Sequence, residues 1–323
     1  MPIAKTLKFA PTKYALALAG CVAALSPAAY AAEPASCGTV RISDVGWTDL
    51  ASTNASFVTV LEALGYKADV KTLGVPVTYS SMKNKDIDVF LGNWMPAQKE
   101  AIQQYLDDKS IDSVAVNLEG AKYTLATNAA GAKLGIKSFK DVAAHKAELD
   151  GKIYGIEPGN EGNGMIVSLI DGDKFGLKGF NVVESSEQGM LSQVTRADKE
   201  NKPVIFLAWA PHPMNTAHQI TYLADGDDTV FGPNYGGATV YTVARGGYAK
   251  ECPNVGKLLT NMKFSLDMEN AIMGKILDDG EDADKAAKTW LKANPTVIEP
   301  WLAGVTTKDG KDGLAAVKTK LGL

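Results

Sequence analysis

Three of the five tryptophans follow short apolar runs of the kind that form buried strands. These residues are Trp47, Trp94 and Trp209, and Tyr123 opens another such run. In α/β sheets, ligands bind in the crevice beyond the carboxyl ends of the strands. The faces of indole and phenol rings attract organic cations by about 0.5–2 kcal/mol per contact. We therefore expect the four rings to converge on a quaternary ammonium group. The alternative is that each ring only covers the surface of its own sheet.

A carboxylate stands close to the first of these rings. Asp49 lies two residues after Trp47 and would favour a net cation over a zwitterion, whose carboxylate would meet a like charge. The alternative is that Asp49 caps the helix expected from Leu50 onward. Asn160 precedes another expected helix and could hydrogen-bond a ligand hydroxyl or simply shape its turn. His212 could bind a ligand carboxylate, although a solvated loop histidine is the favoured interpretation.

Enzyme signatures are absent from the sequence. There is no G-x-S-x-G elbow and no phosphate-binding P-loop, and the three histidines have no metal-binding spacing. The acid-rich segments 225–228 and 278–284 miss the calcium-loop pattern and are expected to be solvated turns. We expect a binding protein without catalytic residues, metal or cofactor.

The charge balance argues against nucleic acid as a partner. The chain carries 33 Lys and Arg against 37 Asp and Glu, for a net charge of −4. Its three arginines are scattered along the sequence. A weakly acidic chain of this kind lacks the basic surface that attracts a phosphate backbone.

The first 31 residues are expected to be an export signal. Three lysines precede an apolar run at 14–25, which is too short to span a bilayer, and Ala29–Ala31 supplies a small-x-small cleavage site. The segment 18–21 offers an alternative, a lipoprotein box that would place a lipid on Cys21. The apolar run continues past Cys21, whereas a lipidated cysteine is normally followed by a polar tether. We therefore favour cleavage after Ala31 and a soluble protein in the periplasm.

Two cysteines remain after that cleavage, Cys37 and Cys252. In an oxidising compartment, two leftover cysteines suggest one disulfide. The alternative is a pair of buried free thiols.

Alternating strand and helix patterns predict an α/β fold with a mainly parallel sheet flanked by helices. Expected strands lie at 39–45, 68–73, 87–91, 123–127, 152–156, 181–183, 204–208 and 241–244. Expected helices lie at 50–65, 77–83, 138–147, 163–171 and 187–199, followed by a helical tail from Cys252. Residues 92–96 are expected to leave their strand as a loop.

Two nearly identical phrases mark where the chain is expected to cross between two lobes. They are YTLA at 123–126 and YTVA at 241–244. The middle of the chain would then form one lobe and its two ends the other. We predict that 32–119 and 247–323 form lobe I and that 120–246 form lobe II.

Four segments carry a resemblance to a known family. They are ISDVGWTD at 42–49, DVFLGNWMP at 88–96, YGIEPGNEGN at 154–163 and FLAWAPHPM at 206–214. In this order, after an export signal, they resemble the quaternary-amine and glycine-betaine substrate-binding proteins of ABC importers. Within that family, the match is to the periplasmic choline-binding proteins. The resemblance covers nearly the whole mature chain. It implies a type II, two-lobed, hinged receptor that closes on its ligand and delivers it to an inner-membrane permease.

The resemblance also implies roles for individual residues. The four aromatic residues would form a cage around the trimethylammonium group of choline. Asp49 would meet the positive charge and the hydroxyl, and Asn160 would also bond the hydroxyl. The family contains a disulfide-bearing group, which is consistent with a bridge between Cys37 and Cys252.

The alternatives differ in ligand or in class. Receptors for glycine betaine or carnitine need a donor for the ligand carboxylate, and no arginine lies in the four segments. His212 and the glycine-rich helix start at 159–164 keep this alternative open. An exported enzyme on the same scaffold would need a nucleophile–base pair that the sequence does not offer. We expect a monomeric choline receptor that binds acetylcholine or betaine more weakly.

Overall fold

The computed structural model describes residues 1–4, 6–7 and 33–323. Residues 1–31 and 32–323 form separate units. The apolar run and cleavage site of the predicted export signal lie outside the described residues, as does Cys21 with its alternative lipidation. Within the described part of the chain, no helix has the length and apolar character needed to cross a membrane.

A mixed sheet of nine strands runs through residues 33–323, in the order β2-β1-β3-β9-β4-β7-β5-β6 with β8 beside β4. The strands are β1 (Thr39–Asp44), β2 (Lys67–Thr72), β3 (Val89–Met95), β4 (Ile111–Thr127), β5 (Lys152–Tyr154), β6 (Asn181–Val183), β7 (Ile205–Ala210), β8 (Thr221–Tyr222) and β9 (Gly237–Arg245).

The two ends of this sheet are parallel and its middle is antiparallel. Parallel pairs join β2, β1 and β3 at one end and β6, β5 and β7 at the other. The parallel sheet predicted from the sequence is confirmed for these strands. Strands β4 and β9 run antiparallel to each other, β9 also to β3, and β4 also to β7 and β8. We call β4 and β9 the crossover strands, because β9 pairs with β3 of one end, β4 pairs with β7 of the other end, and the two pair with each other.

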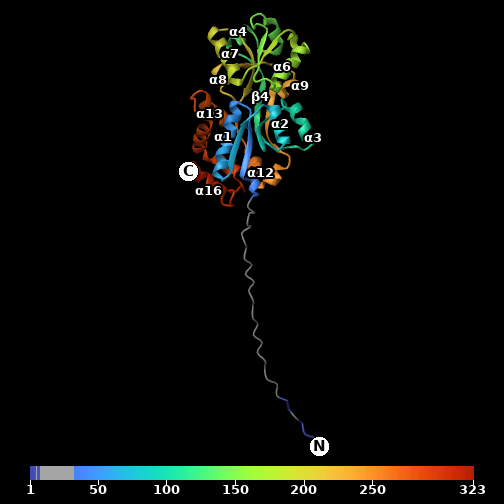
Figure 1. The fold of residues 1–323 in the computed structure, drawn as a ribbon, viewed down its shortest axis with the longest axis vertical. Coiled ribbons are helices and arrows are strands. Elements are labelled where there is room, and N and C mark those ends of the chain that lie inside the picture. Colours follow the sequence, from blue (N-terminus) through green and yellow to red (C-terminus); the bar gives the residue numbers. More distant parts are fainter. Residues whose placement is uncertain (5, 8–32) are drawn as a thin grey trace. The chain divides into compact units, whose positions relative to one another are not determined.

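Helices cover the two ends of the sheet as two groups, which confirms the predicted two-lobed α/β fold (Figure 1). We call the group with β1–β3 the first lobe. Its helices are α1 (Thr48–Ala63), α2 (Val75–Lys83), α3 (Lys99–Asp107), α11 (Tyr248–Glu251), α12 (Pro253–Asn261), α13 (Leu266–Leu277), α14 (Ala283–Ala293), α15 (Ile298–Trp301) and α16 (Gly313–Leu321).

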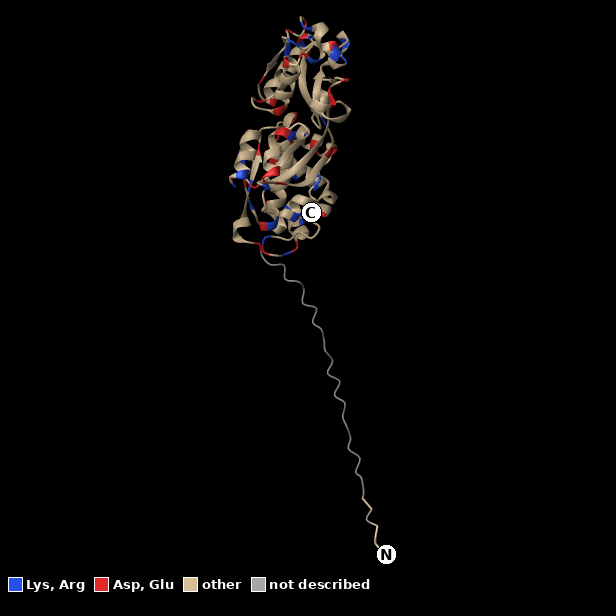
Figure 2. Cartoon of the chain, turned by 90° about the vertical axis from the view of Figure 1, so that its right-hand side faces the viewer, with Lys and Arg blue, Asp and Glu red and all other residues tan. Residues whose placement is uncertain are grey.

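The group with β5–β8 is the second lobe. Its helices are α4 (Ala129–Leu134), α5 (Phe139–Val142), α6 (Glu161–Asp171), α7 (Glu187–Glu200), α8 (Met214–Ala217) and α9 (Asp228–Phe231), and α10 (Pro233–Gly236) lies beside the crossover strands. Short 3-10 turns occupy Ala35–Gly38, Ala143–His145, Lys174–Gly176 and Pro295–Val297. Lysine and arginine residues are interspersed with aspartate and glutamate along the ribbon of both lobes in the view of Figure 2.

Helix α1 anchors one side of the site to the core of the first lobe. Its apolar side packs into that core, since Phe57, Val60 and Leu61 are fully buried. The chain leaves the helix at Gly65, whose φ of 89° suits a residue without a side chain. At the other end, Trp47 occupies the N-cap position and Asp49 lies in the first turn. The packed helix therefore fixes where both residues lie.

The expectation that residues 92–96 form a loop is wrong for most of that segment. Strand β3 continues through Gly92 to Met95, where Trp94 pairs with Val240 of β9. Trp209 likewise lies inside β7, opposite Tyr123 of β4. Gly, Asn and Pro in a short segment are typical of turns. Here the pairing with a distant strand outweighs that local preference.

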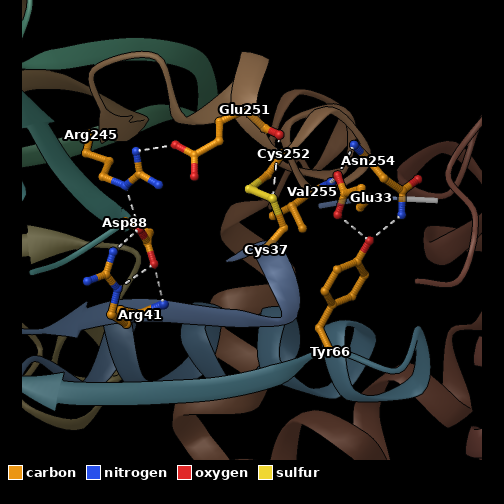
Figure 3. Close-up of a disulfide and its surroundings, with 10 residues drawn as sticks. All are labelled: Glu33, Cys37, Arg41, Tyr66, Asp88, Arg245, Glu251, Cys252, Asn254 and Val255. Carbon is orange, nitrogen blue, oxygen red and sulfur yellow. Dashed lines mark hydrogen bonds and ion pairs between the residues drawn. A yellow bond between two sulfur atoms is a disulfide. The ribbon is translucent and has the colours of Figure 1, made fainter. Parts of the chain in front are cut away.

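A disulfide joins Cys37, in the turn before β1, to Cys252 at the start of α12 (Figure 3). The predicted bridge is confirmed. Beside it, the carboxylate of Glu33 accepts hydrogen bonds from the backbone N–H groups of Asn254 and Val255, the latter at 3.2 Å. The bridge and Glu33 together tie the start of the described body to its C-terminal helices.

Replacing Cys37 and Cys252 by serine should lower the free energy of unfolding by about 2–5 kcal/mol. The bridge closes a loop across a sequence separation of 215 residues and so restricts the unfolded chain. Urea denaturation of the ligand-free mature protein and of the double variant measures the difference. Thiol titration of the denatured, non-reduced mature protein should find no free thiol. Two reactive thiols, or an unchanged denaturation midpoint, would contradict this prediction.

Candidate binding site

The six ligand-binding residues predicted from the sequence line one pocket between the two lobes. The pocket offers about 320 Å³ of space that protein atoms do not fill, including the part of that space that is open to solvent. Its lining residues are Trp47, Asp49, Trp94, Ala97, Gln98, Tyr123, Ile156, Asn160, Glu161 and Trp209. First-lobe residues come from the start of α1 and from β3 with the turn after it. Second-lobe residues come from β7, the start of α6 and the segment before it, and Tyr123 comes from the crossover strand β4.

Three of the aromatic rings form a row across the crossover region. The ring centroids of Trp94 and Tyr123 are 6.0 Å apart, and those of Tyr123 and Trp209 are 6.3 Å apart, each pair tilted by 47°. Register places Tyr123 directly opposite Trp209 on β4 and β7. Trp47 reaches the same pocket from the N-cap of α1. Aromatic residues up to 162 positions apart in the sequence thus line one cavity. Their side chains are almost completely buried.

Glu157 holds two lining residues of different lobes. The indole Nε1 of Trp47 donates to Glu157 Oε1 at 2.9 Å, and Asn160 Nδ2 donates to the same oxygen at 2.9 Å. Glu157 is not among the residues predicted from the sequence. Its only signal was its place in the segment YGIEPGNEGN, three residues before Asn160.

The carboxylate of Asp49 is buried, and only one of its two oxygens has a hydrogen-bond partner among the described residues. Its Oδ2 accepts a hydrogen bond from Trp94 Nε1 at 3.2 Å, whereas Oδ1 has no partner among the described residues. Burial, and then the nearby carboxylate of Glu187, raise the pKa of Asp49 to about 7. Trp47 occupies the N-cap, so the alternative that Asp49 caps the helix is wrong. A buried carboxylate oxygen of this kind is costly unless a donor or a cation meets it.

A second carboxylate, which is not among the residues predicted from the sequence, lies across the pocket. Glu161 is the first residue of α6 and lines the cavity. Its Oε1 is buried without a partner among the described residues, and burial followed by the charge of Glu157 raises its pKa to about 7. The lining residues thus include two acids and no lysine, arginine or histidine. An electrostatic environment of this kind favours a cation.

The structure confirms the turn role that the sequence left open for Asn160, and its bond to a ligand hydroxyl stays a prediction. It caps α6, because its Oδ1 accepts from the backbone N–H of Gly162 at 2.8 Å. The same oxygen accepts from the hydroxyl of Tyr123 at 2.9 Å. A side chain at Gly162 would place its Cβ 2.1 Å from that hydroxyl, so glycine permits the close approach. The amide still faces the cavity, with one of its two Nδ2 hydrogens directed to Glu157.

Both expectations for His212 are wrong. The imidazole is 1% exposed and does not line the pocket. Its ring packs edge-on against Trp209 with centroids 5.2 Å apart. Its Nε2 lies 3.2 Å from Glu187 Oε1. His212 therefore supports the wall of the pocket and binds a carboxylate of the protein itself.

Comparison with known proteins places this pocket in a family. The model of the OpuAC family, described as the substrate binding domain of ABC-type glycine betaine transport systems, matches residues 38–293. The chain belongs to this family. OpuAC-family proteins are substrate-binding components of transport systems, and substrate-binding proteins of this class work in the periplasm or outside the cell.

Two solved structures match nearly the whole of this chain, and a curated relative matches part of it. An ABC-transporter choline binding protein in complex with choline is 68% identical, with a TM-score of 0.88, over 90% of this chain and 100% of that chain. The structure of an ABC-transporter choline binding protein in an unliganded semi-closed conformation is also 68% identical, with a TM-score of 0.82, over 89% of this chain and 100% of that chain. An uncharacterised protein, ORF1 of Chromohalobacter salexigens, is 45% identical over 127 residues, which are 39% of this chain and 82% of that protein.

Proposed function

We propose that this protein is a choline receptor of an ABC importer, which binds choline between its lobes and delivers it to a membrane permease. The observation that carries the proposal is the pocket itself, in which four aromatic rings meet the carboxylates of Asp49 and Glu161. The 68% identical relative that was solved with choline supports the same ligand.

The chemistry of choline matches this lining. Its trimethylammonium group cannot donate hydrogen bonds and is weakly hydrated, so ring faces bind it by about 0.5–2 kcal/mol per contact. In our proposal, Trp47, Trp94, Tyr123 and Trp209 surround the methyl groups. Asp49 meets the charge and accepts from the hydroxyl, to which Asn160 also bonds. Such a cage would bind choline with roughly −8 kcal/mol, which corresponds to a micromolar dissociation constant.

The distribution of these residues couples binding to closure. We assign residues 32–119 and 247–323 to lobe I and residues 120–246 to lobe II. Trp47, Asp49 and Trp94 then belong to lobe I, and the other three predicted residues to lobe II. Because neither lobe completes the cage alone, choline binds the closed form better and shifts the population toward it. We propose that the permease recognises this closed form of a monomeric periplasmic receptor.

Glycine betaine is the second candidate ligand, because the matching family is described by glycine betaine transport. Its trimethylammonium group would suit the same rings. Its carboxylate, however, would enter a pocket whose charged lining residues are Asp49 and Glu161. That like-charge contact disfavours betaine relative to choline.

A ligand panel tests the proposal. We expect calorimetric titration of the mature protein to give a dissociation constant near the micromolar range for choline. Acetylcholine, glycine betaine and the non-quaternary amine ethanolamine should bind at least about tenfold more weakly. Choline recovered after long incubation should be chemically unchanged. Tighter binding of glycine betaine, together with an Asp49→Ala variant of unchanged affinity, would overturn the choline assignment.

A further inference from the structure

A buried carboxylate outside the pocket connects the two lobes. Glu187 is the first residue of α7 in the second lobe and is 1% exposed. Its Oε2 accepts a hydrogen bond from the backbone N–H of Thr48 at 2.9 Å, and its Oε1 accepts from the Thr48 hydroxyl. Thr48 is the first residue of α1 in the first lobe. Two hydrogen bonds therefore run from one lobe to a single carboxylate of the other.

His212 holds this carboxylate from the side of the second lobe. The backbone N–H of Met214 donates to His212 Nδ1 at 2.9 Å. In a neutral imidazole, an accepting Nδ1 leaves the hydrogen on Nε2. Nε2 lies 3.2 Å from Glu187 Oε1 and so donates to it. Glu187 is thus oriented by its own lobe toward donors of the other lobe.

The start of α1 is a favourable place for a negative charge. The first N–H groups of a helix have no partner within the helix, and the helix dipole gives that end a partial positive charge. Thr48 lies directly between Trp47 and Asp49. A carboxylate bound to Thr48 therefore fixes the stretch of chain that carries two of the predicted ligand-binding residues.

We propose that Glu187 is a positioning residue that latches the closed receptor by binding Thr48, without touching the ligand. The proposal rests on the proposed function in one respect, namely that the lobes close around a bound ligand. When the lobes separate, the carboxylate and the Thr48 donors part, and water takes their place. The latch then lowers the dissociation rate of the ligand. Because it does not touch the ligand, it lowers this rate by the same factor for ligands of equal charge.

A pair of substitutions at Thr48 tests the latch. Thr48→Val removes the hydroxyl donor at nearly constant volume, and Thr48→Ser keeps it. We expect Thr48→Val and Glu187→Gln to raise the dissociation rate of choline roughly tenfold in stopped-flow fluorescence, because each weakens a hydrogen bond to a charged group. Thr48→Ser should stay within about twofold of the wild-type rate. Thr59→Val, in the same helix, is the matched control, since its hydroxyl bonds to Ala55 O within α1, and its rate should not change.

A second ligand separates the latch from a ligand contact. Tetramethylammonium carries the same charge as choline but lacks its hydroxyl. Thr48→Val should raise the dissociation rates of both by the same factor, with an unchanged thermal midpoint of the ligand-free protein. Unchanged rates in folded Thr48→Val, or factors that differ between the two ligands, would overturn the latch. If the wild type bound glycine betaine instead of choline, the proposed function would fail, and the latch would still require Thr48→Val to raise the dissociation rate of betaine.

Discussion

Replacing Trp94 by alanine should weaken choline binding by about 1–3 kcal/mol, or roughly 5- to 150-fold. The ring of Trp94 packs beside that of Tyr123. Its Nε1 donates a hydrogen bond to Asp49 Oδ2, whereas Asp49 Oδ1 has no partner among the described residues. The substitution removes a ring from the cage and also leaves Asp49 without that hydrogen bond. Both losses act on the bound cation, so the effect should exceed that of removing a single packing contact.

Calorimetry on folded protein measures this effect. Trp290→Ala is the matched control, because Trp290 lies in α14 and does not line the pocket. That variant loses the same side chain at a distance from the ligand and should keep wild-type affinity. A folded Trp94→Ala variant with unchanged affinity would remove Trp94 from the proposed cage.

Asp49→Asn should weaken choline binding by about 2–3 kcal/mol, because the amide keeps the shape of the carboxylate and removes its charge. The expected pH dependence follows from the same charge. In the ligand-free protein, the pKa values of Asp49 and Glu161 are raised to about 7. A bound cation favours the ionised carboxylates and lowers these pKa values. Affinity should therefore be constant well above pH 7 and fall as the pH drops below it.

Titrations between about pH 5 and 8 check this prediction. The affinity of wild type should fall by up to about tenfold per pH unit for each carboxylate that must lose a proton on binding. Asp49→Asn should reduce the slope, and the double variant Asp49→Asn/Glu161→Gln should nearly abolish it. A wild-type affinity that does not change with pH, or a double variant with the wild-type slope, would contradict the assigned role of the carboxylates.

The same shifts bear on the stability of the ligand-free protein. Folding raises the pKa of Asp49 and Glu161 above their ordinary values, so the folded state favours their protonated forms. Their contribution to stability is therefore full below about pH 4 and is lost as the pH rises through about 7. A bound cation offsets this loss because it stabilises the ionised carboxylates.

The aromatic residues of the pocket could be found from the sequence because the three tryptophans follow apolar runs and Tyr123 opens one. The details of their placement could not. Trp94 and Trp209 lie inside β3 and β7, because pairing with β9 and β4 extends both strands past the turn-forming residues. Strand β4 also begins at Ile111, well before the predicted 123–127, because its first part is held by pairing with β9.

The missed carboxylates have a common cause. Glu157 bonds to Trp47 across 110 residues and Glu187 to Thr48 across 139 residues, so no local spacing marks either pair. Glu161 follows Asn160 directly, yet a glutamate at a helix start is ordinary and does not indicate a pocket. His212 looked like a loop residue because its burial against Trp209 depends on the fold of α7 and β7 together.

In the proposed binding mode, ring faces and carboxylates from both lobes recognise one positively charged, methylated nitrogen. The neutral molecule 3,3-dimethylbutan-1-ol has the shape of choline with carbon in place of that nitrogen. Calorimetric titration of the mature protein with both compounds therefore isolates the charge. We predict that choline binds at least about 30-fold more tightly than the neutral alcohol. Equal affinities would contradict the account.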